Sequence, residues 1–217
     1  MVGGRGLAED GRSMSGAGNR RLLVSVVIPM YQAEEWILET LASVAGQTYP
    51  LIETVVVDDG SSDRGADLVA GFAERAERPF RLVQTTNRGV SPARNLGINE
   101  SNGELLALLD ADDLWHPNKL DLQVERLVQT GAPMRTCGYE FFADQTDRRV
   151  GLVRVEDGSL ALRGWLALEG NGLALASTAV IRRQAWDDLH RFDPRFSVSA
   201  DLDFALRIGE LGHLDAV

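Results

Sequence analysis

Three aspartates directly follow a short apolar run, and their spacing is the feature of the sequence best suited to chemistry. Leu105–Leu109 is apolar, and Asp110, Asp112 and Asp113 come immediately after it. A short apolar run bounded by polar residues is typical of a buried strand that delivers its last residues to a sheet edge. Carboxylates this close repel one another unless a cation or several hydrogen-bond donors lie among them. The segment therefore predicts a positive charge at this edge.

Two other places in the chain carry acids that could do chemistry. Asp58 and Asp59 follow the strand-like segment Leu51–Val57 and precede Gly60. Asp58 could belong to a site, or it could only accept hydrogen bonds from the turn beside Gly60, and both readings stay open. Asp201 falls in the first turn of an expected helix, where the helix dipole tolerates an anion.

The segments that must position these acids alternate between strand and helix patterns. Leu22–Pro29 is almost wholly apolar and β-branched, as expected of a strand covered on both faces, and Pro29 is expected to end it. Between Ala33 and Gly46, apolar residues that include Trp36 and Leu41 recur at helical spacing, which predicts a helix that buries this face.

The same alternation continues through the first 130 residues. Ser91 as N-cap, with Pro92 at the first helical position, is a strong helix start. The remaining expected elements are strands at 51–57, 79–85 and 105–109, and helices at 63–76 and 117–129. This order indicates an α/β fold with a mostly parallel sheet flanked by helices and a functional edge at the carboxyl ends of the strands.

The second part of the chain carries weaker patterns. Strands are expected around Tyr139–Phe142 and Leu173–Ile181, and a final helix is expected to pack through Leu202, Ala205, Leu206 and Gly209. Another strand begins near the end, so we expect a segment beyond Val217 to be missing. The Gly- and Ser-rich residues 1–21 are expected to be a disordered tail, and residues 22–217 one domain.

Composition narrows the classes of partner. The chain has 217 residues, 44% of them hydrophobic, and a formal net charge of -10, which argues against a nucleic acid or an anionic membrane as the main partner. Cys137 is the only cysteine, so neither an intramolecular disulfide nor a thiolate metal cluster can form. No apolar run approaches the roughly 18 residues of a transmembrane helix, and no signal-peptide pattern opens the sequence. We expect a cytoplasmic protein.

Five segments in this order resemble one enzyme family. They are VSVVIPMYQAEEWILETLASVAGQTYP, VVVDDGSSD, NRGVSPARNLGI, LLALLDADDLWHPNKL and SADLDFALRI. Together they resemble the family 2 glycosyltransferases of the GT-A fold, inverting enzymes that use nucleotide-diphosphate sugars. The resemblance runs from about Leu22 to Leu211. It implies a Rossmann-like GT-A domain, a UDP-linked donor, and a hydroxyl of a glycan or lipid-linked acceptor. A lipid-linked acceptor would imply peripheral membrane association.

The resemblance also implies roles for particular residues. Asp59 would accept a hydrogen bond from the nucleobase, while Pro29 and Tyr31 would border the base and ribose. Arg94, near the start of its helix, is suited to the diphosphate because a cation and a helix N-terminus act together there. If the match to Asp59 were misleading, this acid would be only a turn residue.

A metal and a base complete the implied site. Asp112 would lie near the ribose and the metal, and Asp113 would be a direct ligand of Mg²⁺ or Mn²⁺, which carboxylate oxygens suit. Asp110 is expected only to brace this loop. Asp201 matches the catalytic base that takes the proton from the acceptor hydroxyl. An exposed acid at a helix start is its structural alternative.

Departures from the family and competing functions bear on these roles. Gln32 stands where the family commonly has Asn, and Ala200 where a Glu commonly precedes the base. Asp203 and Arg207 have the spacing of a helical ion pair and are expected to be structural. A response-regulator receiver and an Asp-x-Asp phosphatase fit the surrounding residues poorly. A non-catalytic nucleotide-sugar binding protein is the remaining alternative, and turnover separates it from an enzyme.

Overall fold

The computed structural model describes residues 21–143, 148–153, 158–160, 175–189, 191–196, 200–210 and 214–216. All structural statements below concern these residues. The expected tail lies almost wholly outside them and stays a prediction.

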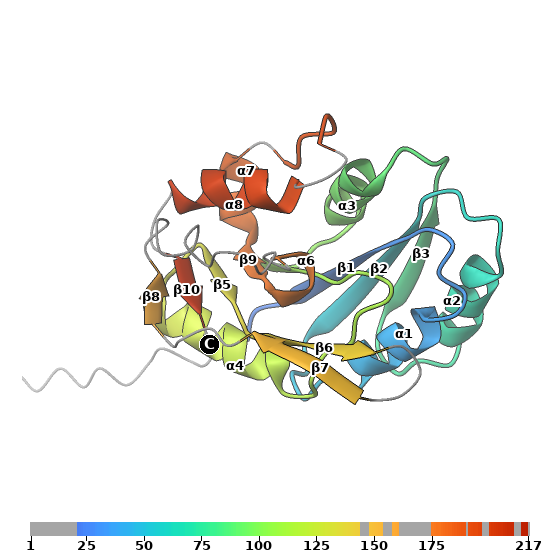
Figure 1. Cartoon of the computed structure of the whole chain (residues 1–217), viewed down its shortest axis with the longest axis horizontal. Helices are drawn as coiled ribbons and strands as arrows, with labels where there is room; N and C mark the ends of the chain where they lie inside the picture. Colours follow the sequence, from blue (N-terminus) through green and yellow to red (C-terminus); the bar gives the residue numbers. More distant parts are fainter. Residues whose placement is uncertain are drawn as a thin grey trace, which may run out of the picture.

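An eight-stranded sheet forms the centre of the molecule, in the order β3-β2-β1-β4-β9-β5-β10-β8 (Figure 1). Strands β1, β2, β3 and β4 are parallel, as expected, and β9 runs antiparallel between β4 and β5. The strands of this sheet are β1 (Val24–Met30), β2 (Ile52–Asp58), β3 (Phe80–Gln84), β4 (Leu105–Leu108), β5 (Met134–Thr136), β8 (Gly158–Leu160), β9 (Val180–Arg182) and β10 (Leu214–Ala216). A separate antiparallel pair consists of β6 (Tyr139–Ala143) and β7 (Arg148–Val153).

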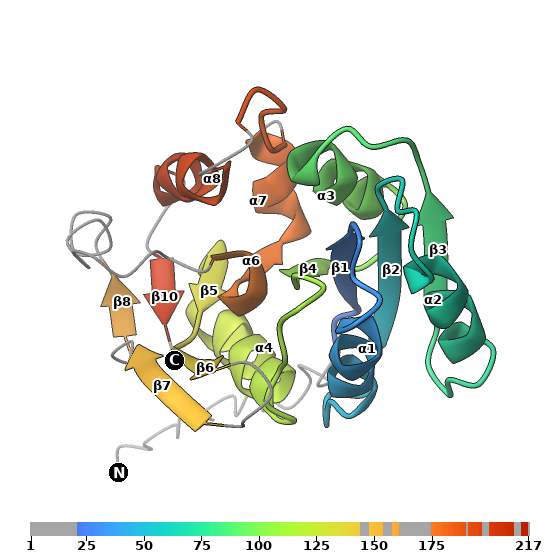
Figure 2. The same ribbon diagram turned by 45° about the vertical axis from the view of Figure 1, so that its right-hand side comes forward.

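Helices cover both faces of the sheet (Figure 2). One face carries α1 (Ile37–Ala45), α2 (Gly65–Ala73) and α4 (Lys119–Thr130), and the other carries α3 (Val90–Asn99), α7 (Arg183–Asp188) and α8 (Ala200–Gly209). A four-residue helix, α6 (Leu175–Thr178), precedes β9. The sheet is therefore the middle layer of three, as the sequence pattern predicted.

Strand β1 shows why an almost wholly apolar run belongs at the centre. All seven of its residues are buried. Because side chains alternate across a strand, Val26 and Ile28 pack in the core beneath α1, α2 and α4, whereas Val27 packs in the core that contains Ile98 and Phe204. A strand covered on both faces has no side exposed to water, so its residues do not alternate between apolar and polar.

Pro29 does not end β1 as predicted, because the strand continues to Met30. The neighbouring strand β4 ends its pairing at Leu108, opposite Val27. Leu109 N donates to Val27 O, which places the odd-numbered backbone groups of β1 on the β4 side. Pro29 lies beyond the last paired residue on that side, so its missing N–H breaks no rung of the β1–β4 ladder.

One expected strand in the second part of the chain was wrong in detail. Leu175–Thr178 is a helix, and of the expected strand Leu173–Ile181 only Val180 and Ile181 lie in a strand, at the start of β9, while Leu173 and Ala174 lie outside the described residues. A single helical turn is too short to show helical periodicity, so an apolar run around it is easily taken for a strand. The strands expected near Tyr139 and just before Val217 are present as β6 and β10.

The final helix, α8, is present but buries a different stripe from the one expected. Ala205 is fully buried, but Leu206 is 36% exposed, and Phe204 and Ile208 face the core instead. The side chains of Leu202 and Gly209 lie outside the described residues. The expected pair of Asp203 and Arg207 is confirmed, with Arg207 Nη2 2.6 Å from Asp203 Oδ2.

Close approach of α3 to the sheet depends on one glycine. A Cβ placed on Gly97 would lie 2.4 Å from Val27 Cγ1 and 3.0 Å from Val57 Cγ2. We expect Gly97→Ala to lower the free energy of unfolding by about 1–3 kcal/mol, because the core is already filled there. Urea unfolding measures this change.

The matched control is Gly71→Ala in α2. A Cβ there meets nothing closer than Arg75 Nη1 at 3.7 Å. Replacing a helical glycine with alanine in open space raises stability by about 0.5–1 kcal/mol. Equal effects of the two substitutions would contradict the close packing of α3.

Candidate functional site

The expected site residues gather at the carboxyl edge of β2, β1 and β4. Because these strands are parallel and in register, the chain leaves all three at the same edge. Asp59 N donates to Met30 O at 2.8 Å, which joins the segment after β2 to the end of β1. The loop that carries Asp110, Asp112 and Asp113 leaves β4 beside them.

Helix α1 and Gln47, which follows its end, hold this acidic loop in place through polar side chains. Three hydrogen bonds join them: Thr40 Oγ1 donates to Ala111 O at 2.8 Å, Trp115 N donates to Ser43 Oγ at 3.2 Å, and Gln47 Nε2 donates to His116 O at 2.8 Å. Thr40 and Gln47 are buried, so these bonds are shielded from water. The backbone of residues 111–116 is therefore fixed, and Asp112 is left exposed to solvent.

Ser177 in α6 holds the same loop from the other side. Its Oγ accepts a hydrogen bond from Asp110 N at 3.0 Å, and its hydroxyl is also hydrogen-bonded to the carboxylate of Asp113. Its carbonyl oxygen accepts a hydrogen bond from Trp115 Nε1 at 2.7 Å. Sequence reasoning missed Ser177, because a single serine in a short run of small residues carries no pattern.

Arg94 connects two acids that are far apart in the sequence. Its side chain lies in the protein interior, with Nη2 2.8 Å from Asp110 Oδ1 and Nη1 2.5 Å from Asp201 Oδ1. Burial opposes the charge on the guanidinium, but the two carboxylates outweigh it and raise the pKa of Arg94. Both terminal nitrogens therefore already serve the protein's own acids, a pairing that the sequence pattern did not reveal.

Asp201 lies in the first turn of α8, as predicted, in a mostly apolar environment. Burial raises the pKa of its carboxyl above the ordinary value and repulsion from Asp110 adds to this, while Arg94 and a hydrogen bond from Ala176 N oppose the rise. The result is a stronger base than an exposed aspartate.

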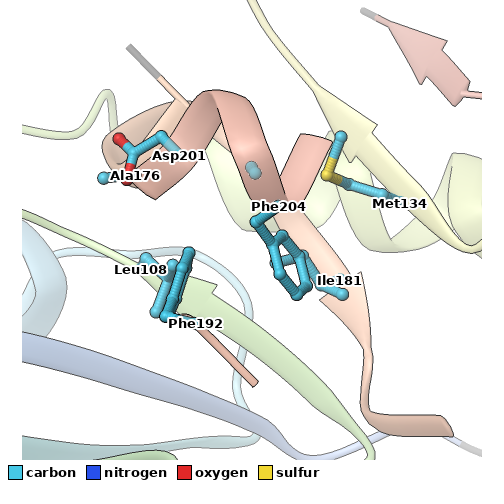
Figure 3. Close-up of a pocket in the computed structure, with 8 residues that line it drawn as sticks. Leu108, Met134, Ala176, Ile181, Phe192, Asp201 and Phe204 are labelled. Carbon is cyan, nitrogen blue, oxygen red and sulfur yellow. The ribbon is translucent and has the colours of Figure 1, made fainter. Parts of the chain in front are cut away.

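A small cavity lies beside this carboxylate. Figure 3 shows Asp201 next to Ala176, at one side of a space that Met134, Ile181 and Phe204 line. Its volume of about 10 Å³ leaves room for one water molecule at most. Such surroundings offer the carboxylate little solvation from the side of the core.

The acids after β2 bind the backbone of neighbouring loops. Asp58 Oδ1 accepts a hydrogen bond from Ser61 N at 2.9 Å, so the turn role left open for Asp58 is confirmed. Asp59 is 4% exposed, and its two oxygens accept hydrogen bonds from Arg88 N at 2.9 Å and Gly89 N at 2.7 Å. Asp59 therefore fixes the loop that leads into α3, whatever else it binds.

The two residues expected beside the base and ribose differ in exposure. Pro29 is buried within β1, and Tyr31 is 53% exposed. Tyr31 therefore offers a ligand an aromatic surface, whereas Pro29 offers little side-chain surface. Trp36, which periodicity assigned to the core, is instead 43% exposed at the start of α1.

Gln32 has a backbone φ of 53°, in the left-handed region. Asparagine tolerates this region better than most residues, which gives a physical reason for the family's preference for Asn at this position. The longer amide of Gln32 reaches the turn after β2: Ser62 N and Asp63 N donate to its Oε1 at 2.9 and 3.1 Å. Gln32 in place of Asn therefore still joins the loop after β1 to the turn after β2.

Helix α3 also positions the segment that leads to α8. Asn95 Nδ2 donates to Phe192 O at 2.9 Å, and Phe192 N donates to Asn95 Oδ1 at 3.1 Å. Ser91 is not the N-cap of α3, as was expected; Gly89 is, and Ser91 Oγ donates to Phe196 O at 3.1 Å. The Ser91 hydroxyl therefore binds a distant backbone carbonyl and does not cap its own helix.

The acidic loop suits a divalent cation shared with a ligand. Asp112 is exposed, Asp113 is partly exposed, and repulsion from Asp110 and Asp112 adds to burial in raising the pKa of Asp113. Among the described residues, no group of three or more His, Cys, Asp or Glu side chains is arranged to hold an ion. Mg²⁺ at nucleotide sites takes one or two carboxylates and completes its shell with phosphate oxygens and water. The residues fit that arrangement and not a cage built by the protein alone.

Comparison with known proteins gives a consistent family match. Residues 25–186 match the family described as Glycosyl transferase family 2. An uncharacterised glycosyltransferase of Haemophilus influenzae is 29% identical over 160 residues, which are 74% of this chain and 62% of that protein. Glycosyltransferase GlyG of Streptococcus pneumoniae is 30% identical over 125 residues, which are 58% of this chain and 41% of GlyG. The chain thus spans less than two thirds of the length of these relatives.

Solved structures share the fold. TarS 1-349 of S. aureus in complex with UDP-GlcNAc has a TM-score of 0.71 at 21% identity, covering 90% of this chain and 56% of that one. The mannosyltransferase PcManGT of Pyrobaculum calidifontis, in complex with GDP-Man and Mn²⁺, has a TM-score of 0.70 at 24% identity, covering 92% and 55%. The expected GT-A fold is therefore confirmed. In the part of the chain that the structure describes, no helix has the length and apolar character to cross a membrane.

The contacts of Asp59 generate a prediction about stability. In Asp59→Asn, one acceptor oxygen becomes an NH₂ group that faces a backbone N–H, so a buried donor loses its partner. We expect the free energy of unfolding to fall by about 1–3 kcal/mol. Urea unfolding tests this, with the exposed Asp67→Asn in α2 as control. A loss no larger than that of the control would mean that these two hydrogen bonds contribute little.

Proposed function

Because the chain belongs to glycosyl transferase family 2, we propose that it transfers a sugar from a nucleotide-diphosphate sugar, UDP-linked, to a hydroxyl of a glycan or lipid-linked acceptor with inversion at the anomeric carbon. One observation carries this proposal. Arg94 joins Asp201 to Asp110, and the loop that begins at Asp110 also holds Asp112 and Asp113. A candidate base and candidate metal ligands are thereby fixed relative to one another.

The donor would lie across the carboxyl edge of the parallel strands. In this proposal the base and ribose lie against Tyr31 and the loop that Asp59 anchors, with Asp59 sharing its oxygens between that loop and the nucleobase. The UDP-GlcNAc complex of TarS supports a uridine nucleotide as the first donor to test.

Arg94 takes a different role in this proposal from the diphosphate contact that the resemblance implied. Its terminal nitrogens bind Asp110 and Asp201, and its side chain is 4% exposed. A guanidinium already paired with two carboxylates has little charge left for a third anion. We therefore assign Arg94 to holding Asp201 in place.

Asp112 and Asp113 would hold Mg²⁺ or Mn²⁺, which supplies positive charge to the leaving diphosphate. The Mn²⁺ bound with GDP-Man in PcManGT supports such an ion. Asp201 would accept the proton of the acceptor hydroxyl as that oxygen bonds to the anomeric carbon. The bond from the anomeric carbon to the diphosphate oxygen breaks on the opposite face, so the configuration inverts.

The metal assignment predicts a linkage between ion and nucleotide. Mn²⁺ is expected to raise the affinity for UDP, because an ion held by Asp113 would neutralise negative charge that otherwise repels the diphosphate. Asp113→Ala should abolish this gain. Calorimetric titration of UDP with Mn²⁺ and with EDTA tests both statements. Equal affinities in the two conditions would argue strongly against the metal site.

The base assignment predicts a loss of turnover without a loss of binding. Asp201→Asn keeps the shape but removes the basic oxygen, so transfer should slow about a hundredfold to ten-thousandfold while UDP affinity stays near that of the parent. The melting temperature should stay within a few degrees of the parent, because burial and Asp110 oppose the ionised carboxylate that Arg94 stabilises.

Sugar transfer, UDP affinity and melting temperature are measured on the same two preparations. Undiminished transfer by the Asn variant would remove Asp201 from the mechanism. Asp201 would then be only an acid at a helix start, which contributes about 0.3–1 kcal/mol of stability. A parent protein that binds UDP-sugars but transfers none would favour the non-catalytic binding protein.

A further inference from the structure

We infer that Ser177, in the short helix α6, is a positioning residue that sets the geometry of the metal loop relative to the base. The inference rests on the proposed function and adds to it a residue on the far side of the loop. Ser177 touches neither of the groups that would react, but it is hydrogen-bonded to the segment that carries the candidate metal ligands.

The hydroxyl of Ser177 uses its donor and one acceptor site on two parts of one loop. A serine hydroxyl has one donor and two acceptor lone pairs. Here the oxygen accepts from Asp110 N at 3.0 Å, so the O–H is available to donate to the Asp113 carboxylate. This donor would restrict the orientation of the Asp113 carboxylate. Ser177 is 8% exposed, so water replaces its hydrogen bonds poorly.

Residues on both sides of Ser177 give α6 a fixed place. Ala176 N is hydrogen-bonded to Asp201, so adjacent residues of α6 contact the metal loop and the base. Thr178 O accepts from Gln123 Nε2 at 2.8 Å, and Gln123 Oε1 accepts from Lys119 Nζ at 2.6 Å. The helix thus rests on a buried polar network from α4 and cannot shift without breaking it.

Such a hydrogen bond to a metal ligand should govern how tightly the ion is held. Removing partners of metal ligands typically costs about 10- to 100-fold in metal affinity or activity. Ser177→Ala should therefore raise the Mn²⁺ concentration that gives half of the full increase in UDP affinity by about tenfold or more. Ser177→Thr keeps the hydroxyl and should stay closer to the parent.

The test measures UDP affinity by calorimetry over a series of Mn²⁺ concentrations, with melting temperature measured on each preparation. Ser101→Ala is the matched control, because Ser101 is 7% exposed and its hydroxyl binds Ile98 O and Arg183 Nη2, away from the acids. It should lose stability but keep the Mn²⁺ dependence of the parent. If Ser177→Ala does not fold, Ser177→Cys, with a weaker donor of similar shape, should still shift the Mn²⁺ dependence in the same direction.

Two results would overturn the inference, and they are distinguishable. An unchanged Mn²⁺ dependence in a folded Ser177→Ala or Ser177→Cys variant, with a normal dependence in the parent, would remove only the role of Ser177. A parent whose UDP affinity does not respond to Mn²⁺ at all would remove the metal function and this role together.

Discussion

The site depends on the two ion pairs that the buried guanidinium of Arg94 forms with Asp110 and Asp201. It lies 16 residues from Asp110 and 107 residues from Asp201, and it holds both carboxylates at once. One cation between two anions leaves a net negative charge inside the protein, which burial makes costly. The arrangement persists because every charged group has a partner, whereas removing Arg94 would leave two partly buried acids without their cation. Removing one partner of a fully buried ion pair typically costs about 3–5 kcal/mol, and the partial exposure of the two acids makes the cost smaller here.

Around these three charged groups, apolar side chains form the layers of the fold and polar side chains fix the loops. Apolar residues of β1 and β4 fix the layers of the fold. Within those layers, hydroxyls and amides at a few buried positions hold the loops: Thr40 and Gln47 hold the acidic loop, and Asn95 holds the backbone of Phe192. Such polar groups are costly to bury unless they are paired, so each specifies one loop geometry more sharply than apolar packing does.

Much of the fold could be predicted from the sequence, since apolar runs and helical periodicity are local patterns. The parallel strands, their order along the chain and the ion pair of Asp203 and Arg207 follow from such patterns. The connections within the site could not be predicted in the same way. Ser91 has the features of a helix cap, yet its hydroxyl binds Phe196 O, 105 residues away. A lone polar residue carries no sequence signal of its distant partner, so Ser177 and Asn95 were missed for the same reason.

The wide separation of Arg94 and Asp201 along the chain also has a consequence for synthesis. At roughly 5–20 residues per second, Asp201 leaves the ribosome on the order of 5–20 s after Arg94. For most of that interval the segments of β1 to β4 and Asp110 are already outside the ribosome, but the guanidinium still lacks its second acidic partner. The nascent chain thus passes through a stage in which it has the groups proposed to bind a donor but not the group proposed to activate an acceptor.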